Sequence, residues 1–490
     1  MVTARLVVAG THSGVGKTTV ATGLLGAFAA RGRAVTGFKV GPDFIDPSYH
    51  ALATGRPGRN LDAFLSGPRL VAPLFAHGAA GADLAVVEGV MGLFDGAKGG
   101  GELASTAQVA KLLRAPVLLV VDCSAMARSA AAVVHGFASF DPEVWLAGLV
   151  LNRVASERHE ELLREALTPL GVPVLGVLRR SDSLATPERH LGLVPAAERR
   201  AAARRTVADL AAAVAVACDL DRVAAVAAAA PVLHADAWEP RAHAQPGPST
   251  ARVAVASGPA FTFVYQENLE LLEANGAELV AVDPTVDERL PHATAALYLG
   301  GGFPETYAAA LSANEPLRAA VRRFATSGRP VVAECGGLLY LARSLDGLPM
   351  CGVLHADGRM TGRLTLGYRQ ASAVSPSPLA EPGHALRGHE FHYARLEPRV
   401  GDQPAWLLGD PVHGDPPAPP PGDPVHGAPP ARPPGEPGHG APPSASSGAL
   451  PRGRPEGFVA GGVHASFLHT HWAAFPDAPS RLVAAAAVGT

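Results

Sequence analysis

Cysteine is scarce in this chain of 490 residues, with four in total and no C-x-x-C pair. A disulfide framework and a cysteine-based zinc site are therefore excluded, and a reducing compartment is expected. Positive charge is not in excess either, because 41 Lys and Arg face 44 Asp and Glu. Without a basic stripe, the sequence offers no surface for nucleic acid or an anionic membrane. The expected partners are small molecules.

Long uncharged apolar runs are also missing. The alanine-rich stretch 207–232 is the candidate for a membrane span, but Asp209, Asp219, Asp221 and Arg222 interrupt it. It therefore predicts soluble helix. The sequence enters an apolar run and a glycine-rich loop at once, so we expect no signal peptide. These features favour a cytoplasmic protein.

The chain is long enough for two or more domains. Short apolar runs alternate with helical patterns and predict strands at 5–9, 34–38, 84–88, 117–121, 146–151 and 173–178. This alternation predicts an α/β domain over 1–225 with a doubly wound, mainly parallel sheet. Ligands then bind beyond the carboxyl ends of the strands.

A low-complexity linker, placed at 226–250, precedes a second α/β domain over 251–490. Its expected strands are 252–256, 278–282, 295–299 and 330–333, with a helix over 267–274. Seventeen prolines between Pro404 and Pro455 predict a disordered insertion at about 400–456. His413, His426 and His439 recur in it, which leaves a metal-binding tail or a drifting repeat as alternatives.

A glycine-rich loop joins the first expected strand to a helix expected at 18–30. In GTHSGVGKTT, Gly14 and Gly16 lie in the turn, where backbone N–H groups can surround phosphate oxygens. Lys17 is expected to reach the β- and γ-phosphates, and the Thr18 hydroxyl to hold Mg²⁺. The loop is one residue longer than G-x-x-x-x-G-K-[ST], yet an ordinary turn explains the glycines and not Lys17-Thr18.

Two further residues belong to the predicted ATP site. Thr19 follows the loop directly, and Asn152 ends the expected strand LVLNRV. Asn152 is a candidate reader of the adenine edge, and a plain turn residue is the alternative.

Charged side chains follow two neighbouring strands. Lys39, Asp43 and Asp46 lie in FKVGPDFIDP, and Glu88 ends DLAVVE. Each carboxylate alone would be read as a solvated loop charge. Beside a phosphate loop, however, Mg²⁺ needs one or two carboxylates. We therefore expect Thr18, Asp43 and Glu88 to hold the metal.

In the second domain, Cys335 lies in RPVVAECGGLLYL, a strand–turn–helix setting typical of a nucleophile elbow. The helix N-terminus is expected to lower the pKa of the thiol. Gly301 and Gly302 of LGGGFPE, with the backbone of Gly336, are expected to bind an oxyanion. The alternative, a buried structural thiol, needs none of these glycines.

A thiol nucleophile needs a base. His469 in GVHASFLHTHW is the leading candidate, with His464 and His471 as neighbours that could replace it.

The motifs GPDFIDP, VEGVMGLFDG, LGGGFPE, AECGGL and GHEFHY together resemble the cobyrinate or hydrogenobyrinate a,c-diamide synthase family. The resemblance covers nearly the whole chain outside the proline-rich insertion. It implies two doubly wound α/β domains. The first is P-loop NTPase-like and similar to dethiobiotin synthetase, and the second resembles a class I glutamine amidotransferase.

The resemblance also implies an activity. Cys335 would release ammonia from glutamine through a thioester. ATP would phosphorylate the a and c acetate carboxylates of the corrin ring in turn, and ammonia would displace phosphate. Lys17 and Lys39 would balance the phosphoryl charge, and Asp46 would help Asp43 to place the substrate. Mg²⁺, ATP and glutamine are thus expected. A corrinoid is the expected partner, and a homodimer the expected assembly.

The sequence departs from the class I pattern at one point. The position two residues after the base, often Glu in that class, is His471. A Cys–His dyad is therefore expected, with no third member assigned. In GHEFHY, His389 and Glu390 have either a structural or a functional role.

Other proteins share parts of this pattern. Cobyric acid synthase and Ni-sirohydrochlorin a,c-diamide synthase share both domains. A regulatory ATPase of the chromosome-partitioning type has an early loop Lys where this chain has His12, and it leaves Cys335 unexplained. A stand-alone dethiobiotin synthetase fails for the same reason. An inactive scaffold would not retain Lys17, Glu88 and Cys335.

Overall fold

Six of the expected apolar runs form strands of one parallel sheet in the computed structural model, which describes residues 3–180, 188–189, 192–193, 200–244, 251–409 and 453–488. The sheet has the order β3-β2-β4-β1-β5-β6-β7. Its strands are β1 (Ala4–Gly10), β2 (Val35–Val40), β3 (Arg59–Leu61), β4 (Leu84–Glu88), β5 (Val117–Asp122), β6 (Leu146–Val154) and β7 (Val174–Arg179). The three-residue strand β3 is an addition to the expected set.

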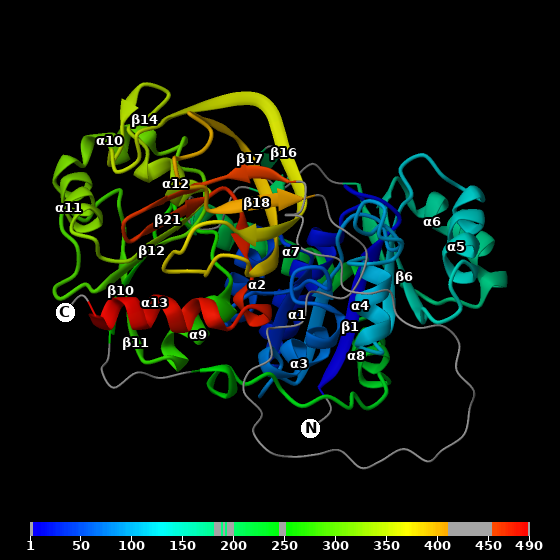
Figure 1. Cartoon of the computed structure of the whole chain (residues 1–490). Coiled ribbons are helices and arrows are strands. Elements are labelled where there is room, and N and C mark those ends of the chain that lie inside the picture. The colour runs from blue at the N-terminus through cyan, green and yellow to red at the C-terminus, as the bar shows by residue number, and fades with distance from the viewer. Residues whose placement is uncertain are drawn as a thin grey trace, which may run out of the picture.

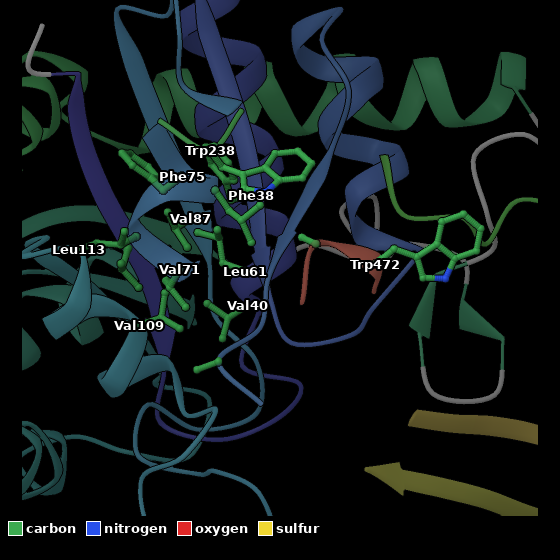
Figure 2. Close-up of a cluster of buried hydrophobic side chains, with 14 of the residues drawn as sticks. Phe38, Val40, Leu61, Val71, Phe75, Val87, Val109, Leu113, Trp238 and Trp472 are labelled. Atoms are coloured by element: carbon green, nitrogen blue, oxygen red, sulfur yellow. The ribbon is translucent and has the colours of Figure 1, made fainter. Parts of the chain in front are cut away.

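Helices cover both faces of this sheet, as double winding requires (Figure 1). The helices on one face are α1 (Lys17–Ala30), α2 (Asp46–Thr54), α7 (Arg200–Ala217) and α8 (Leu220–Ala228). Those on the other are α3 (Pro68–Gly78), α4 (Thr106–Leu112), α5 (Ser129–Ser139) and α6 (Glu157–Leu167). Figure 2 shows the second face, where Phe38, Val40, Leu61 and Val87 of the sheet meet Val71, Phe75 and Val109 of α3 and α4.

The alanine-rich stretch folds as expected for soluble helix. It supplies part of α7 and all of α8, and Leu210, Val214 and Val223 are buried in the first half. Across the described ranges, no helix is both long and apolar enough to cross a membrane.

The connection between the halves contains an anchored tryptophan. Trp238 is buried against α3. Its backbone N–H donates to Pro73 O at 3.0 Å, and its ring centroid is 5.2 Å from that of His77. The segment placed at 226–250 as a linker is thus pinned to the first domain at this point.

A second, six-stranded sheet has the order β11-β10-β12-β13-β21-β20, and only β20 runs antiparallel to its neighbour. Its strands are β10 (Ala251–Ala256), β11 (Ala277–Val282), β12 (Ala296–Leu299), β13 (Val331–Glu334), β20 (Phe458–Ala460) and β21 (Val463–Ser466). One face packs on α9 (Gln266–Ala274) and α13 (Asp477–Val488). The other packs on α10 (Ala308–Ala313), α11 (Glu315–Thr326) and α12 (Gly336–Leu341). The two doubly wound, mainly parallel sheets confirm the expected fold class.

The second half also carries a mostly antiparallel sheet that the sequence did not predict. It is built on β16 (Asp357–Ala373) and β17 (Ala385–Glu397), which pair along most of their length. The other strands are β14 (Ser344–Leu345), β15 (Leu348–Pro349), β18 (Trp406–Gly409), β19 (Arg454–Glu456) and β22 (His469–Thr470). Among the described strands of this sheet, only the β14–β16 pair is parallel. The paired strands β18 and β19 lie inside the limits expected for the insertion. The repeat itself, with His413, His426 and His439, lies outside the described residues.

Candidate active site

The glycine-rich loop occupies residues 11–16 between β1 and α1. Gly14 and Gly16 have φ of 79° and 100°, a left-handed conformation that glycine adopts without strain. Gly10 ends β1, and a Cβ there would lie 2.4 Å from Val15 Cγ2. The turn therefore needs its glycines, and it exposes backbone N–H groups at a helix start, as phosphate binding requires.

Lys17 opens α1 with its ammonium folded back over the loop. Its Nζ donates to His12 O at 3.1 Å and to Met91 O at 2.5 Å. Burial and then the neighbouring Lys39 lower the pKa of Lys17 to about 8. Since backbone carbonyls hold it, this ammonium is available to an anion entering the loop.

Glu88 is a fully buried carboxylate at the carboxyl end of β4. It accepts hydrogen bonds from Lys39 Nζ at 2.9 Å, Thr18 Oγ1 at 2.5 Å and His50 Nε2 at 2.8 Å. Burial alone would raise its pKa, but Lys39 and then His50 outweigh burial and bring the pKa below its ordinary value. Glu88 is therefore a charged centre beside the phosphate loop.

Asp46 completes this cluster. Its Oδ2 lies 2.6 Å from Lys39 Nζ and 3.4 Å from Thr18 Oγ1. Asp43 instead turns its carboxylate onto the loop backbone and accepts from the N–H of Ile45 and Asp46. The sequence predicts Asp43 as the metal ligand beside Thr18 and Asp46 as a substrate-placing residue, whereas in the structure Asp46 is the one in contact with Thr18.

Burial lowers the pKa of Lys39, but Asp46 and Glu88 outweigh it and bring that pKa above its usual value. Burial, reinforced by Asp43 and Glu88, raises the pKa of Asp46. Crowded carboxylates of this kind favour the arrival of another cation.

Thr19 lies in the first turn of α1 and is half-buried. Asn152, near the end of β6, donates through Nδ2 to Val15 O at 2.8 Å, and its Oδ1 accepts from the Arg153 N–H. Asn152 therefore braces the phosphate loop. Its role toward adenine stays a prediction.

Cys335 lies at the turn between β13 and α12, with φ 48° and ψ −98°. This sparsely populated backbone conformation is the one expected of a nucleophile elbow. The Cys335 N–H donates to Ser466 O at 2.7 Å, and the thiol lies 3.7 Å from Phe391 O. The thiol therefore points at β17 and not into solvent.

The expected fall in the Cys335 pKa is wrong. Burial of the thiol, followed by the charge of Glu305, raises the pKa well above its usual value. The hydrogen bond from the Gly336 backbone lowers the pKa but is the smaller effect. The sequence showed the helix N-terminus and could not show that the thiol is 3% exposed.

The glycines expected to bind the oxyanion lie beside the elbow. A Cβ at Gly336 would be 3.0 Å from Gly302 N. The Gly301 N–H, by contrast, already donates to Phe263 O at 3.0 Å. Gly302 and Gly336 are therefore better placed than Gly301 to offer donors.

His469 is the candidate base that reaches this point. It lies on β22, which pairs with β17, and a Cβ at Gly301 would be 2.4 Å from its Cε1. Among the described residues, neither ring nitrogen of His469 has a hydrogen-bond partner. Burial and then His392 lower its pKa to about 3.

The two neighbouring histidines are engaged elsewhere. His464 Nδ1 is 3.1 Å from Ser377 Oγ, and His471 Nε2 is 3.5 Å from Glu267 Oε2. No carboxylate contacts His469 within the part of the chain that the structure describes. This arrangement supports a Cys–His dyad with His469 as base.

His389 and Glu390 of GHEFHY are buried, and both have polar partners. His389 Nε2 lies 3.0 Å from Tyr265 Oη, and its ring stacks on His469 with centroids 4.9 Å apart. Glu390 accepts from Arg369 at 2.7 Å and Arg454 at 3.0 Å. Burial would raise the Glu390 pKa, but the hydrogen bond with His392 and then the charges of Arg454 and Arg369 lower it to about 2.

Sequence reasoning missed two residues of the site. His50 follows Asp46 by four positions and so lies on the same face of α2, a spacing that could have indicated it. Phe44 lies between Asp43 and Asp46, and its ring contacts the second half of the chain. Nothing in the local sequence indicates that contact.

Over the residues that are described, no group of three or more His, Cys, Asp or Glu side chains could hold a metal ion. The hydroxyl of Thr18 and the carboxylates of Asp46 and Glu88 are nevertheless hard oxygen donors. Such a set suits Mg²⁺, which keeps substrate phosphates and water among its ligands.

Comparison with known families matches each half. Residues 6–194 match the CobQ/CobB/MinD/ParA nucleotide binding domain. Residues 252–412 match the CobB/CobQ-like glutamine amidotransferase domain.

Comparison with known proteins extends over the full chain. The hydrogenobyrinate a,c-diamide synthase of Streptomyces coelicolor is 54% identical over 509 residues, covering 98% of this chain and 96% of that protein. That of Mycobacterium tuberculosis is 47% identical over 489 residues, covering 99% and 98%. The cobyrinate a,c-diamide synthase of Synechococcus is 45% identical over 409 residues, covering 82% and 89%.

Proposed function

The chain belongs to the family of hydrogenobyrinate and cobyrinate a,c-diamide synthases, and from that premise we propose hydrogenobyrinate as its substrate. The protein is a glutamine-dependent amidoligase that uses ATP to convert the a and c acetate carboxylates into carboxamides. The identity to hydrogenobyrinate-named relatives, 54% and 47%, against 45% for a cobyrinate-named one, favours the cobalt-free ring.

The thiol centre supplies the nitrogen. Cys335 Sγ attacks the glutamine amide carbon while His469 takes the thiol proton, and the oxyanion accepts hydrogen bonds from Gly302 and Gly336. The proton passes to the leaving nitrogen, the C–N bond breaks, and ammonia leaves a glutamyl thioester. Water then attacks the thioester, giving glutamate and the free thiol.

The phosphate centre activates the acid. A carboxylate oxygen of the macrocycle attacks the γ-phosphorus of ATP, the bond to the bridging oxygen breaks, and ADP leaves an acyl phosphate. Ammonia then attacks the acyl carbon, loses a proton and expels phosphate to form the amide. Lys17, folded over the phosphate loop, and Lys39, beside Glu88, would balance charge on the transferring group.

Thr18, Asp46 and Glu88 would hold Mg²⁺, which would neutralise negative charge on the phosphates of ATP. Asp43 would act on this site through the loop that it braces. Glu88 ends β4, and Asp43 and Asp46 follow β2, so these carboxylates lie beyond the carboxyl ends of strands, where α/β sheets bind ligands.

One observation carries this proposal: a single chain holds both the buried Lys39–Asp46–Glu88 cluster beside a phosphate loop and the Cys335 elbow beside His469. A regulatory P-loop ATPase or a stand-alone dethiobiotin synthetase would account only for the first. The expected homodimer stays a proposal.

The test is to incubate the protein with ATP, Mg²⁺ and glutamine and, separately, with hydrogenobyrinate, cobyrinate and Ni-sirohydrochlorin, and to follow the mass of each macrocycle. Two successive carboxylate-to-carboxamide conversions of hydrogenobyrinate are expected. Turnover confined to either of the other rings would contradict the substrate assignment. A lack of turnover with every ring would contradict the synthetase function.

A further inference from the structure

Phe44 is the point at which the phosphate-binding half reaches the thiol centre. Its ring centroid is 5.0 Å from that of Phe263 and 4.5 Å from that of Tyr265. The same ring lies 5.1 Å from the imidazole of His469 and 5.7 Å from that of His389. An aromatic side chain of the first half is thus packed over the base of the second.

The backbone on either side of Phe44 belongs to the phosphate centre. Asp46, two residues on, contacts both Lys39 and Thr18. Asp43, one residue before, caps the N–H groups of Ile45 and Asp46. Residues 43–46 thus form a short segment with internal hydrogen bonds that carries the Phe44 ring. When the groups that contact Asp46 change, this segment is displaced.

The opposite end of this segment is fixed. Asn60 Nδ2 donates to Gly41 O and to Asp43 O, each at 2.7 Å. Asn60 thus holds the loop on the N-terminal side of Phe44, while the C-terminal side moves with Asp46. A movement of Asp46 is therefore transmitted to the Phe44 ring between them.

The thiol centre is enclosed in this arrangement. The side chains of Cys335 and His469 are 3% and 0% exposed, and the thiol lies under the Phe391 carbonyl. Both ring nitrogens of His469 are buried without a partner in the described chain, although a catalytic base needs one of them for the thiol proton. Glutamine cannot reach Cys335 until a neighbouring group moves.

We propose that Phe44 is a positioning residue that couples the two centres: while its ring covers His469, glutamine hydrolysis is suppressed, and engagement of Asp46 by the ATP-site ligands withdraws the ring. Withdrawal lets His469 meet the Cys335 thiol and lets ammonia leave toward the activated carboxylate. Glutamine is then consumed only when a carboxylate is ready for it. This coupling rests on the proposed function.

Phe263 also borders His469, and Tyr265 contacts the neighbouring His389 and His471, but both residues belong to the thiol half and lie on no segment of the phosphate site. Phe44 is therefore the ring through which a ligand at Asp46 can act.

The experiment compares Phe44→Ala and Phe44→Leu with the unaltered chain. Phe140→Ala serves as control, because Phe140 is 74% exposed and lies on α5's C-terminal flank in the first half. Glutamate formation is measured with glutamine alone, and then with ATP, Mg²⁺ and hydrogenobyrinate. Labelling of Cys335 by a glutamine-like diazo-ketone without ATP gives a second readout.

Removal of the ring should raise glutamine hydrolysis and Cys335 labelling in the absence of ATP about tenfold. With all substrates present, more than one glutamate should form for each amide. Both rates for Phe44→Leu should lie between those of Phe44→Ala and the unaltered chain, and both rates for Phe140→Ala should match those of the unaltered chain. Unchanged or reduced hydrolysis in both Phe44 variants would overturn the proposal.

Synthesis supported by ammonium salts separates this proposal from the proposed function. If the Phe44 variants make amide from ammonia but still hydrolyse glutamine only when ATP, Mg²⁺ and hydrogenobyrinate are present, only the coupling role fails. If the unaltered chain makes no amide from either nitrogen source, the proposed function itself fails. Should Phe44→Ala melt at a lower temperature, Phe44→Leu and the labelling rate decide the outcome.

Discussion

Glu88 and Glu334 occupy equivalent positions in the two halves of the molecule. Each is the last residue of a parallel strand, and each is buried. Glu88 meets Lys39 and His50, which lower its pKa despite burial. Glu334 meets neutral donors, the backbone N–H and hydroxyl of Thr470, and burial raises its pKa to about 7. The charge of a buried carboxyl is thus set by what surrounds it and not by its place in the fold.

The same contrast extends to the two reactive centres. The phosphate centre gathers ammonium and carboxylate groups that are already paired, as a site for polyanions and a metal requires. The thiol centre holds a Cys–His pair in which burial disfavours both charged forms. The first centre can therefore bind its ligands as it stands, whereas the second needs a rearrangement before the Cys–His pair can react.

Removing the thiol should have the largest effect. Cys335→Ala is expected to lower glutamine-dependent synthesis by more than about 10⁴-fold, because no other group forms the thioester. Synthesis from ammonia should continue, since the phosphate centre is intact. The control is Cys123→Ala, which removes a buried thiol from the first half.

Both rates are read from amide formation with each nitrogen source in turn. Substantial glutamine-dependent synthesis by the Cys335 variant would show that the nucleophile is another residue.

Removing the charge of Glu88 should affect both nitrogen sources. In Glu88→Gln, Lys39 and His50 lose their shared charged partner and the proposed Mg²⁺ site loses a ligand, so synthesis should fall about 10²-fold or more with glutamine and with ammonia alike. Glu161→Gln, an exposed change on α6, is the matched control. If Glu88→Gln lost synthesis with glutamine but kept synthesis with ammonia, the assignment of Glu88 to the phosphate centre would be contradicted.

The two carboxyls should respond to pH in opposite directions. Because the folded-state pKa of Glu334 is raised from 4.5 to about 7, its contribution to stability is complete below about pH 4.5 and is lost as pH rises through 7. This loss is on the order of 3 kcal/mol. Glu88, with its lowered pKa, contributes above about pH 4.5 and loses that contribution as pH falls.

Chemical denaturation at a series of pH values checks this contrast. Glu334→Gln should flatten the fall in unfolding free energy between about pH 4.5 and 7, while Glu161→Gln should leave it in place. Parallel curves for Glu334→Gln and the unaltered chain would mean that Glu334 is not the group that titrates.

The smallest effect is expected where the halves meet. Tyr368 of β16 donates to Asp62 Oδ2 at 2.8 Å across the interface. Tyr368→Phe should lower the unfolding free energy by about 1 kcal/mol, the usual value of one hydrogen bond. A double-mutant cycle with Asp62→Asn isolates the pair, and a coupling energy near zero would show that the contact adds no stability.

The sequence predicted those features that local pattern controls. The strand expected at 84–88 is β4 residue for residue, because a buried apolar run ends there at a charged side chain. The Cys335 turn was predicted because an elbow needs small residues after the nucleophile.

The features it missed depend on distant contacts. Strand β3 contains Arg59, whose guanidinium is buried only because Glu267 and Glu270 of α9 receive it. In β16, many side chains are half-exposed, so no clean alternation marks the strand. The pKa of Cys335 and the position of Phe44 likewise follow from packing between segments far apart in the chain.

An isotope competition tests most directly whether the two centres act in series within one molecule. Glutamine carrying heavy nitrogen in its side-chain amide is supplied together with ATP, Mg²⁺, hydrogenobyrinate and an excess of unlabelled ammonium ions. If ammonia passes from Cys335 to the acyl phosphate inside the protein, both new carboxamides carry the heavy nitrogen. Carboxamides labelled only in proportion to the mixed ammonia in solution would contradict the account.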